Sequence, residues 1–521
     1  MKFKIPDKIS LVLEKLENSG FEVFLVGGCV RDLLRKTKPK DWDITTNAKP
    51  KEILKIFPDG KYENQFGTVI IPAKYIDNGN KKEDDLNNIE ITTYRIESAY
   101  SDKRRPDKIK FAKTLEEDLS RRDFTCNAIA LRIKSQKTDT YEIIDLFNGQ
   151  IDIKKRVIRA VGNPKERFGE DALRMMRAIR FASQLSEGEN LSFLKNRKGI
   201  GQQNKKIRNK NFWKIENETF LAIKKNAHLL KLISPERISD EFQKIILSDR
   251  PAWGIELLVE SGLMKYIIPE IYNTIGVRQN RHHYYGPFNT VYKHMLAALK
   301  TCPSEKLEVR LAAFFHDIGK PKSKRGHGYN STFYGHEYIS AGMTQRILER
   351  LKFPRKIIDK TVLLVKNHMF YYNVDEVGEK GVRRVIKKVG LENINDLIDV
   401  RIGDRLGSGV AKAVPYKLRH FKYMVEKLSR DPISVKDLKI NGNILIRKYN
   451  FKPGPQMGAI LEILLAEVLD NPKLNTKQYL SKRALELQKK DLSQLRKMAK
   501  DKIKEEEKEQ EKVIKNKYWI K

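Results

Sequence analysis

The chain has 521 residues, which is too long for one ordinary core and predicts roughly three or four folding units. Lys and Arg number 103 against 67 Asp and Glu, so the formal net charge is +36. This excess favours RNA or DNA over a basic protein as partner, because neutralising each phosphate releases counterions. An AT-rich genome, which inflates lysine, is the alternative explanation.

Cysteine usage and hydropathy exclude further classes of protein. The three cysteines Cys29, Cys126 and Cys302 are far apart and form no CxxC pair, which excludes a disulfide framework and a thiolate zinc site. No uninterrupted apolar run exceeds that of residues 311–315, far short of a membrane span. We expect a soluble, unprocessed cytoplasmic protein with no membrane partner and no obligate protein partner.

Residues 1–150 mix helical and extended patterns and predict an α+β head. The expected elements are a first helix to about Ser19, a strand Val23 to Val26, a Gly-Gly turn, a helix Val30 to Leu34, strands at Gly67 to Pro72, Ile89 to Ile96 and Tyr141 to Ile144, and a polar hairpin tip over 77–88.

The turn at Gly27 and Gly28 has the features of a phosphate site. Glycines between a strand and a helix let backbone N–H groups approach phosphate oxygens, and Arg31 on the first helical turn supplies a guanidinium fork. Gly-Gly turns are common, so this signal is weak when it stands alone.

Asp41 and Asp43 follow at a short distance and flank Trp42. In a strand, residues i and i+2 share a face, so both carboxylates point to one side, close enough for one or two hard cations. A polar strand end is the alternative for an isolated Asp-x-Asp. For an isolated Asp-x-Asp that alternative would be preferred, but the preceding Gly-Gly turn and Arg31 favour a metal site.

From Asn163 onward the hydrophobic period is helical, and Asn163, Pro164 and Glu166 give a helix start signal. The basic residues 195–214 indicate a flexible insertion, which is either a solvated loop or an RNA-backbone contact. Most histidines fall within 282–410, a second helical unit, and a third unit follows Pro415. Beyond Leu485, dense mixed charge predicts a frayed, solvated helix.

Asp171, Arg174, Arg177 and Arg180 recur every third residue along one predicted helix. This spacing makes a slowly drifting stripe, and arginines within an otherwise apolar helix require an anion. A solvated stripe with an ordinary ion pair from Glu170 to Arg174 explains the pattern equally well.

Taken together, the head motifs resemble a known family. In chain order they are Gly27-Gly28-x-x-Arg31-Asp32, Asp41-x-Asp43, Tyr100-x-Asp102-x-Arg104-x-Pro106, Asp118-Leu119-x-Arg121-Arg122-Asp123-Phe124-Thr125-x-Asn127-Ala128, Asp145 to Gly149, Glu170-Asp171-x-x-Arg174-x-x-Arg177-x-x-Arg180-Phe181 and Glu236-Arg237-Ile238-x-x-Glu241. This series resembles the bacterial-type tRNA nucleotidyltransferases (CCA-adding enzymes) and their poly(A) polymerase relatives over the first 270 residues. The order of so many motifs makes the resemblance specific.

The resemblance implies a polymerase-beta-like nucleotidyltransferase head with a mixed sheet, followed by an all-helical neck, body and HD domain. It implies that Asp41 and Asp43 carry two Mg²⁺ ions, one for the attacking hydroxyl and one for the triphosphate. Glu90 is the candidate third carboxylate, although an exposed glutamate on an edge strand gives the same pattern. The implied nucleotide contacts are Gly27, Gly28, Arg31, Arg121, Arg122 and Asp123; a salt-bridged helix surface is the alternative for the last three.

Base selection without a template follows from the same resemblance. Asp171 would accept from the exocyclic amine shared by cytosine and adenine, and Arg174 would donate to the ring edge, which excludes UTP and GTP. Arg177 and Arg180 would hold the triphosphate or the helix itself. Asn148 replaces the first of the family's two hinge glycines, and we expect it to adopt left-handed backbone angles.

His294, His316, Asp317 and Asp404 are spaced as in HD-domain metallophosphohydrolases, and His336 and His368 could complete a second metal site. Imidazoles with bridging carboxylates suit a divalent transition metal that activates water. Core histidines are the alternative. Even with metal bound, the unit is either a phosphodiesterase or phosphatase, or a scaffold.

The predicted divisions are a nucleotidyltransferase head (1–150), a neck for base selection and RNA binding (151–275), an HD metal-binding domain (276–415), a helical tRNA-binding domain (416–485) and a charged tail (486–521). The predicted function is addition or repair of the 3′-terminal CCA of tRNA from CTP and ATP. The stretch Gln65 to Val69 resembles the CCA-adding branch rather than poly(A) polymerases, and the basic loop 98–108 argues against CC-only adders. Poly(A) addition, partial addition, an HD hydrolase acting on RNA ends and a non-enzymatic RNA-binding protein remain as alternatives.

Overall fold

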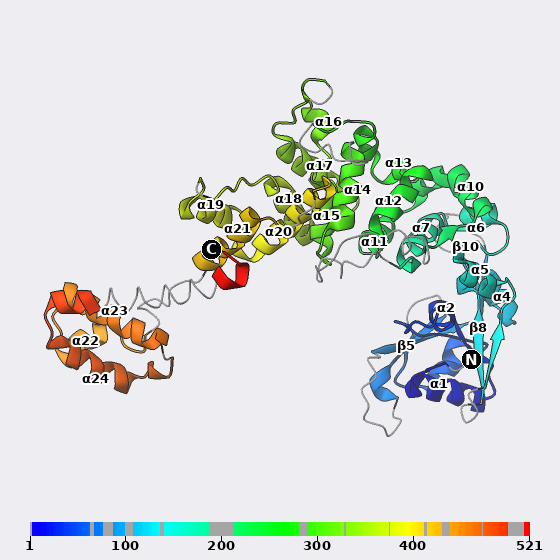
Figure 1. Cartoon of the computed structure of the whole chain (residues 1–521). Coiled ribbons are helices and arrows are strands. Elements are labelled where there is room, and N and C mark those ends of the chain that lie inside the picture. Colours follow the sequence, from blue (N-terminus) through cyan, green and yellow to red (C-terminus); the bar gives the residue numbers. More distant parts are fainter. Residues whose placement is uncertain are drawn as a thin grey trace. The chain divides into compact units, whose positions relative to one another are not determined.

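The computed structural model of the chain is shown in Figure 1. It describes residues 3–62, 67–76, 87–98, 108–135, 140–187, 212–280, 290–327, 330–374, 376–410, 414–429, 438–470, 472–498 and 515–520. The predicted hairpin tip at 77–88, basic loop at 98–108, insertion at 195–214 and the pair Gln65 and Phe66 lie wholly or largely outside these residues. The chain forms two compact units, residues 1–366 with 399–410 and residues 367–398 with 411–521.

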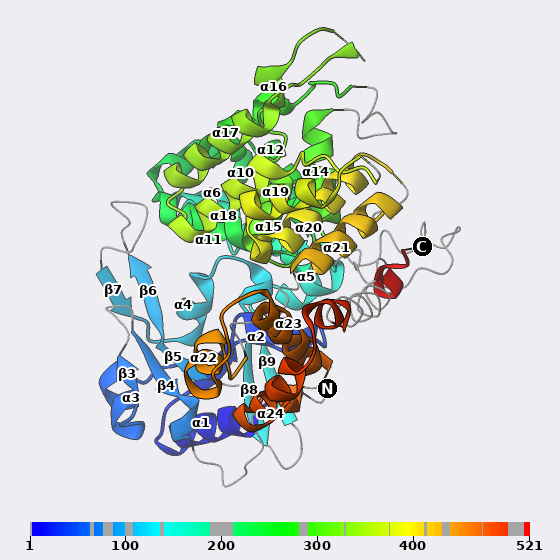
Figure 2. The same ribbon diagram turned by 90° about the vertical axis from the view of Figure 1, so that its left-hand side faces the viewer.

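The first unit begins with the predicted α+β head, which is built on a mixed sheet of order β3-β4-β5-β2-β1-β8-β9. The strands are β1 (Val23–Val26), β2 (Asp43–Thr46), β3 (Lys61–Tyr62), β4 (Thr68–Pro72), β5 (Asn88–Thr93), β8 (Ala130–Ser135) and β9 (Thr140–Ile144). Strands β2 and β5 run parallel, and the other neighbours in this sheet are antiparallel. A separate hairpin pairs β6 (Arg95–Ser98) with β7 (Lys108–Phe111), and α4 packs against β6 (Figure 2).

Apolar spacing explains how the head helices are placed. The head helices are α1 (Asp7–Asn18), α2 (Gly28–Leu34), α3 (Pro50–Ile56) and α4 (Leu115–Ser120). Helix α1 buries Ile9, Val12 and Leu16, whose spacing puts them on one face, and it packs against β1, whose residues are all buried. The predicted first helix, first strand and second helix are therefore confirmed to within about two residues.

A left-handed residue leads from the sheet into α5 (Gly149–Lys155). Asn148 has φ 58° and ψ 30°, which confirms the expectation that asparagine adopts the hinge conformation here. The Asp145 carboxylate accepts the backbone N–H groups of Gly149 and Gln150 at 2.7 and 2.9 Å. A Cβ at Gly149 would lie 2.2 Å from the carbonyl oxygen of Thr125, so only glycine fits.

The remainder of the first unit is almost entirely helical. Its helices are α6 (Pro164–Glu170), α7 (Leu173–Leu185), α10 (Asn217–Asn226), α11 (Pro235–Ile246), α12 (Pro251–Glu260), α13 (Met264–Ile267), α14 (Val291–Thr301), α15 (Leu307–Phe315), α16 (Lys320–Ser323), α17 (His336–Arg350) and most of α18 (Arg355–Asn367), with a short parallel pair of β10 (Val157–Ile158) and β11 (Lys214–Ile215). The predicted start of α6 is confirmed, since Asn163 Oδ1 accepts the N–H of Lys165 at 3.0 Å.

Two glycines bring the end of α20 (Leu391–Gly407) against α14. A Cβ at Gly403 would lie 2.8 Å from the carbonyl oxygen of Ala298, and one at Gly407 would lie 2.7 Å from its backbone nitrogen. The close approach of these two backbones places Asp404 beside α14, which carries His294.

The second unit contains α19 (Glu379–Val389), α21 (Tyr416–Ser429), α22 (Gly442–Tyr449), α23 (Pro455–Asp470) and α24 (Lys477–Gln488). Helices α22, α23 and α24 share one apolar core with Leu445, Ile460 and Leu480 at its centre. Residues 515–520, predicted to be solvated, instead pack on α21: Ile520 is buried, and Lys517 reaches Glu426 at 2.7 Å. The finer division into five parts stays a prediction.

Among the described helices, none combines the length and apolarity needed to cross a membrane.

Candidate functional site

The parallel pairing of β2 and β5 sets the acidic groups of the head side by side. Asp43, the first residue of β2, is in register with Glu90 of β5. Cross-strand partners project to the same face of a sheet, so the two carboxylates are neighbours. Asp41 lies two residues before Asp43 and is exposed, and its charge acts on Asp43. Asp41 lies in the bend before β2 rather than in the strand, so its predicted place on one strand face with Asp43 is not seen, while the register sets Glu90 of β5 beside Asp43.

Gly27 lets a cation and a carboxylate approach the backbone together. A Cβ at Gly27 would lie 3.1 Å from Nη1 of Arg122 and 3.2 Å from Oδ2 of Asp43, and its φ of +77° also favours glycine. Burial raises the pKa of Asp43; Arg122 counteracts this, whereas the charge of Asp41 raises the pKa further. The turn therefore places a guanidinium next to the carboxylate cluster.

Arg31 and Arg122 are positioned by carboxylates of their own. Arg31 donates to both oxygens of Asp32 at 3.0 Å and to the side-chain oxygen of Asn127 at 2.9 Å. Arg122 donates to Asp118 Oδ2 at 3.1 Å. Both guanidiniums are held rather than free to swing, which preorganises them at the glycine turn.

Asp118 is a residue that sequence reasoning did not select. Its fully buried carboxylate accepts from Nη2 of Arg121 at 2.7 Å and from Arg122, so one carboxylate holds two arginines. Burial would raise the pKa of Asp118, but the two guanidiniums outweigh it and lower the pKa. The spacing of an aspartate three and four residues before two arginines was the available signal.

The arginine stripe of α7 meets carboxylates of the first unit. Arg177 donates to Asp123 Oδ2 at 2.7 Å, and Arg180 lies 2.7 Å from Oε2 of Glu241 on α11. These contacts hold α7 against its neighbours, in line with the second of the two roles expected for Arg177 and Arg180. Burial would raise the pKa of Asp123, but Arg177 outweighs this and lowers it.

Asp171 is the extended residue that ends α6, whereas Arg174 lies in the first turn of α7, so the prediction that Asp171 shares one helix with the three arginines is wrong. Asp171 accepts the N–H of Leu173 at 3.0 Å and binds Arg237 at 2.7 Å. Arg174 pairs with Glu170 and donates to the carbonyl oxygen of Arg121 at 3.1 Å. The contact of Arg174 with Arg121 connects the start of α7 to the segment that carries Arg121. The roles of Asp171 and Arg174 in base selection stay predictions.

The donor set of the head suits a hard cation. Asp41, Asp43 and Glu90 offer carboxylate oxygens, the ligands that Mg²⁺ prefers. A divalent ion would also favour the ionised form of Asp43, which burial alone disfavours. The residues present therefore fit Mg²⁺ at this position.

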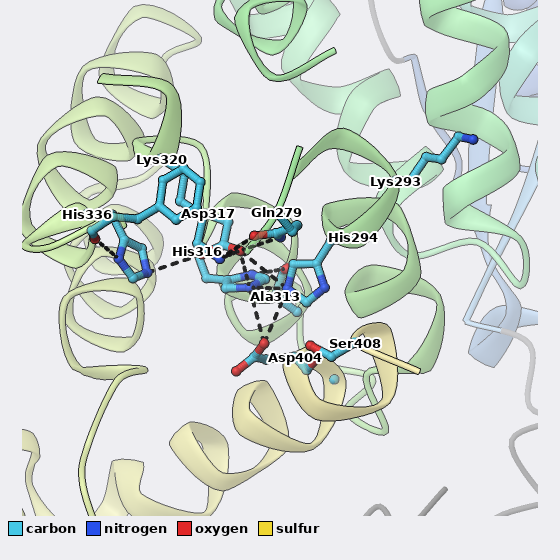
Figure 3. Close-up of polar contacts among 12 residues, drawn as sticks. Gln279, Lys293, His294, Ala313, His316, Asp317, Lys320, His336, Asp404 and Ser408 are labelled. Atoms are coloured by element: carbon cyan, nitrogen blue, oxygen red, sulfur yellow. Dashed lines mark hydrogen bonds and ion pairs between the residues drawn. The ribbon is translucent and has the colours of Figure 1, made fainter. Parts of the chain in front are cut away.

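A second cluster lies among helices α14, α15 and α20 of the same unit (Figure 3). Nε2 of His294 is 3.0 Å from Nε2 of His316, 3.3 Å from Asp317 Oδ2 and 3.2 Å from Asp404 Oδ1. The four side chains point toward one another and are each at most 4% exposed. The predicted convergence of these four residues is thus seen in the structure.

Further polar groups surround this cluster. Lys320 Nζ lies 2.6 Å from Asp317 Oδ2 and 3.0 Å from Gln279 Oε1, and His336 Nε2 lies 3.2 Å from Asp317 Oδ1. Burial would raise the pKa of Asp317, but His316 and Lys320 lower it well below its usual value. Sequence reasoning did not select Gln279 or Lys320 as site residues. Gln279 is distant in sequence and reaches Asp317 only in the folded chain, whereas the spacing of Lys320 three residues after Asp317 was an available signal. His368 belongs to the second unit, so its part in the site stays a prediction.

Three protein families match successive parts of the chain. They are "Poly A polymerase head domain" over residues 23–159, "Probable RNA and SrmB- binding site of polymerase A" over 213–274 and "tRNA nucleotidyltransferase domain 2 putative" over 339–484. The CCA-adding enzyme of Ligilactobacillus salivarius is 43% identical over 268 residues, which are 50% of this chain and 55% of that protein. The match thus spans about half the length of this relative.

A longer match decides the family. The CCA-adding enzyme of Lactobacillus delbrueckii subsp. bulgaricus is 32% identical over 470 residues, or 89% of this chain and 94% of that protein. The chain belongs to the CCA-adding enzyme family. Membership implies a divalent metal ion, typically Mg²⁺, as cofactor of the nucleotidyltransferase head.

A solved structure agrees with this membership. The crystal structure of the Bacillus stearothermophilus CCA-adding enzyme in complex with CTP shares 25% identity with this member of the family, with a TM-score of 0.55. The likeness covers 92% of this chain and 98% of that one. The fold predicted from the head motifs, a mixed-sheet head followed by helices, is thereby confirmed.

Proposed function

We propose that this chain adds or repairs the 3′-terminal CCA of tRNA, using CTP and ATP. The observation that carries the proposal is the register of Asp43 with Glu90, together with the charge of Asp41 acting on Asp43, beside the Gly27 turn and Arg122. Carboxylates next to a preorganised guanidinium and a glycine turn form a site for a nucleoside triphosphate with its metal ions. Family membership identifies the reaction class.

Each group of the head has a task in this reaction. Asp41, Asp43 and Glu90 would hold two Mg²⁺ ions, which would supply activation of the 3′-hydroxyl and stabilisation of charge on the triphosphate. Arg122, held by Asp118, and Arg31, held by Asp32, face the phosphates with their positions already fixed. Gly27 and Gly28 allow the phosphates to approach the backbone.

Asp171 and Arg174 select the incoming base. A carboxylate acceptor and a guanidinium donor match the amine and ring nitrogen edge of cytosine and adenine, while a carbonyl facing Asp171 is repelled. Arg237 holds the second oxygen of Asp171 at 2.7 Å, which fixes the orientation of the carboxylate. Arg121, whose carbonyl oxygen accepts from Arg174, links this pair to the phosphate-binding segment.

Stepwise addition tests the proposal. tRNA transcripts ending before the CCA, after the first C and after the second C are each incubated with Mg²⁺ and a single labelled triphosphate. The proposal expects CTP to extend the first two transcripts, ATP to extend the third, and UTP and GTP to extend none. Repeated addition of AMP to every transcript would instead establish a poly(A) polymerase, and addition of CMP alone a partial adding enzyme.

We propose in addition that His294, His316, Asp317 and Asp404 hold a divalent transition metal in a structural role. Four donor groups meet within a few ångströms, and their burial leaves the centre shielded from solvent and substrate. Asp404 is also held by Arg401 at 2.8 Å, and His316 by the carbonyl oxygen of Ala313 at 2.8 Å, as expected for oriented ligands. A metal here would join α14, α15 and α20.

Metal analysis of the purified chain tests this second proposal. We expect about one equivalent of metal in the parent, loss of that metal in His316→Ala, and a lower midpoint of thermal unfolding after chelation. Hydrolysis of a cyclic phosphate or phosphomonoester by the metal-loaded parent, abolished in His316→Ala, would contradict the structural role. A parent without bound metal and with an unchanged midpoint after chelation would contradict the metal itself.

A further inference from the structure

The last described residues of the chain are anchored on α21 of the second unit. The segment 515–520, here called the C-terminal segment, makes a helical turn whose Lys517 Nζ and Tyr518 hydroxyl lie 2.7 and 2.8 Å from Glu426 Oε2. Ile520 is 7% exposed. The end of the chain is therefore fixed by contacts on both sides of Trp519.

Trp519 has an unusual conformation between these anchors. Its φ is +52°, in the left-handed region that residues other than glycine, asparagine and aspartate rarely adopt. Its indole is 76% exposed, whereas tryptophan is highly buried on average. This left-handed angle ends the helical turn, because the N–H of Ile520 bonds the carbonyl oxygen of Lys515 at 2.9 Å and that of Trp519 bonds the carbonyl oxygen of Asn516 at 3.2 Å, and it leaves the ring in solvent.

Arg419 of α21 lies near the ring of Trp519. Its guanidinium carbon lies 5.9 Å from the centroid of Trp519 and 5.9 Å from that of Tyr416, which is itself 41% exposed. Within the described part of the chain, no carboxylate pairs with Arg419, and its buried Nε has no hydrogen-bond partner. An unneutralised planar cation therefore lies near two exposed aromatic rings.

Helix α19, which packs against α21, adds further positive charge. The contact includes an ion pair of 3.2 Å between Glu379 and Lys427. Four basic side chains of α19 are exposed and have no carboxylate partner among the residues that can be described: Arg383, Arg384, Lys387 and Lys388. We call α19, α21 and the C-terminal segment together the aromatic–cationic surface.

We propose that the aromatic–cationic surface binds an unpaired segment of the tRNA, with a base stacked on Trp519 and phosphates held by Arg419 and the basic residues of α19. Exposed aromatic rings beside unpaired cations are the combination by which proteins bind single-stranded nucleic acid. The choice of tRNA as ligand rests on the proposed function. The family match in this region ends at residue 484, so no comparison assigns a role to Trp519.

Binding of the full chain to fluorescently labelled tRNA and to an unstructured oligoribonucleotide tests the proposal. Trp519→Ala should weaken both complexes by about 5- to 100-fold, and Trp519→Phe should retain most of the affinity. Tyr334→Ala is the matched control, since Tyr334 is 80% exposed but belongs to the first unit. Arg419→Gln should reduce the slope of log K against log salt by about 0.7 to 1.

Intrinsic tryptophan fluorescence distinguishes RNA binding by Trp519 from a purely structural role, because only RNA binding would quench the Trp519 emission during titration. Stacking on Trp519 should quench part of the parent's tryptophan emission during RNA titration, and this quenching should be lost in Trp519→Ala. Unchanged RNA affinity and quenching in Trp519→Ala would overturn the proposal. So would a Trp519→Ala defect confined to binding of anionic vesicles or to self-association, which would assign the surface to a membrane or a second copy.

The outcome is separable from the proposed function. A parent that adds no nucleotides but loses RNA affinity in Trp519→Ala would refute CCA addition and support RNA binding by this surface. A parent that adds CCA, with Trp519→Ala and Trp519→Phe both indistinguishable from it in tRNA affinity, would refute the present proposal alone.

Discussion

At the scale of single residues, buried carboxylates of the first unit hold arginines in fixed positions. Asp118 holds Arg121 and Arg122, and Asp123 holds Arg177, at distances of 2.6 to 3.1 Å. The pKa values of Asp118 and Asp123 are accordingly lowered, whereas that of Asp43 is raised by burial. Burial and the charge of Asp41 thus disfavour the ionised form of Asp43, which a bound divalent cation would favour.

Asp171→Asn tests base selection with little structural change. The amide keeps an oxygen for the N–H of Leu173 but loses the negative charge and gains an N–H donor, which can donate to the carbonyl oxygens of UTP and GTP. We expect discrimination against UTP to fall by about 10- to 100-fold, corresponding to about 1–3 kcal/mol, with a smaller loss in CTP addition.

Single-nucleotide incorporation with each triphosphate provides the measurement, and Asp240→Asn, an exposed aspartate of α11, is the control. Discrimination as sharp in Asp171→Asn as in the parent would place base selection elsewhere. Arg174→Ala should show the same loss of selectivity, since it removes the donor of the pair.

Asp118→Asn should destabilise the first unit in a pH-dependent way. Because its folded pKa is lowered, the carboxylate contributes stability above its unfolded pKa of about 3.9, and this contribution is lost as the pH falls through the folded pKa. Breaking such a buried pair costs about 3 kcal/mol near neutral pH.

Thermal unfolding of parent and Asp118→Asn between pH 7 and pH 3 is the measurement. We expect a lower midpoint for the variant at pH 7 and a difference between the two midpoints that narrows as the pH falls below the unfolded pKa. Glu116→Gln changes an exposed carboxylate of the same helix and should leave the midpoint unchanged. A gap of constant size across the whole pH range would contradict the ion-pair explanation.

Local sequence patterns predicted part of this site. The alternation around Glu90 was readable because it follows the period of a strand, whereas Asp41 lies in a bend before β2. The contact of Arg177 with Asp123 was not readable, because these residues are separated by many intervening positions and meet only in the folded chain. The same applies to Gln279 and Asp317.

At the scale of elements, close backbone packing at three glycines determines where functional residues lie. Gly149 allows α5 to lie against the carbonyl oxygen of Thr125, and Gly403 with Gly407 allows α20 to lie against α14. Part of the head was predicted from periodicity and turn residues, whereas α3 and β8 were not, and the predicted strand Ile89 to Ile96 is divided into β5 and β6. The parallel pairing of β2 with β5, which brings Glu90 to Asp43, was not predictable, since periodicity does not reveal strand order.

Gly149→Ala should destabilise the chain strongly. The added Cβ would lie 2.2 Å from a backbone oxygen that cannot move without displacing the segment after Arg122, so we expect a cost of about 3 kcal/mol. Gly169→Ala in α6 is the matched control, because nothing lies within 4 Å of its Cβ and alanine favours a helix by about 0.5–1 kcal/mol.

Chemical denaturation of the two variants and the parent provides the comparison. We expect Gly149→Ala to unfold at a lower denaturant concentration and Gly169→Ala at an equal or higher one. Equal stability of Gly149→Ala and the parent would show that α5 does not need this close approach.

At the scale of the whole molecule, the chain consists of two compact units and carries a large positive charge. Composition predicted a polyanionic partner, and family membership agrees with this. Composition did not predict that residues 515–520 return to α21, because a short charged segment carries no periodic signal for a distant partner such as Glu426.

The affinity for tRNA should depend steeply on salt. If about six phosphates are neutralised, log K should fall with log salt with a slope of about −5, or roughly a 10³-fold loss between 50 and 200 mM. The rate of nucleotide addition at saturating tRNA should change little over the same range. Filter binding and single-turnover addition at each salt concentration measure the two quantities, and a slope near zero would contradict a phosphate-binding surface.

The most direct test of the account is single-turnover addition of CMP to tRNA lacking its CCA, measured for the parent and for Asp43→Asn at saturating Mg²⁺. We expect the variant to lose at least about 10³-fold in rate while its affinity for tRNA stays within a few fold, because Asp43 acts on the chemistry and the basic surface acts on binding. Near-normal addition by folded Asp43→Asn would contradict the placement of the reaction at the carboxylates of β2 and β5.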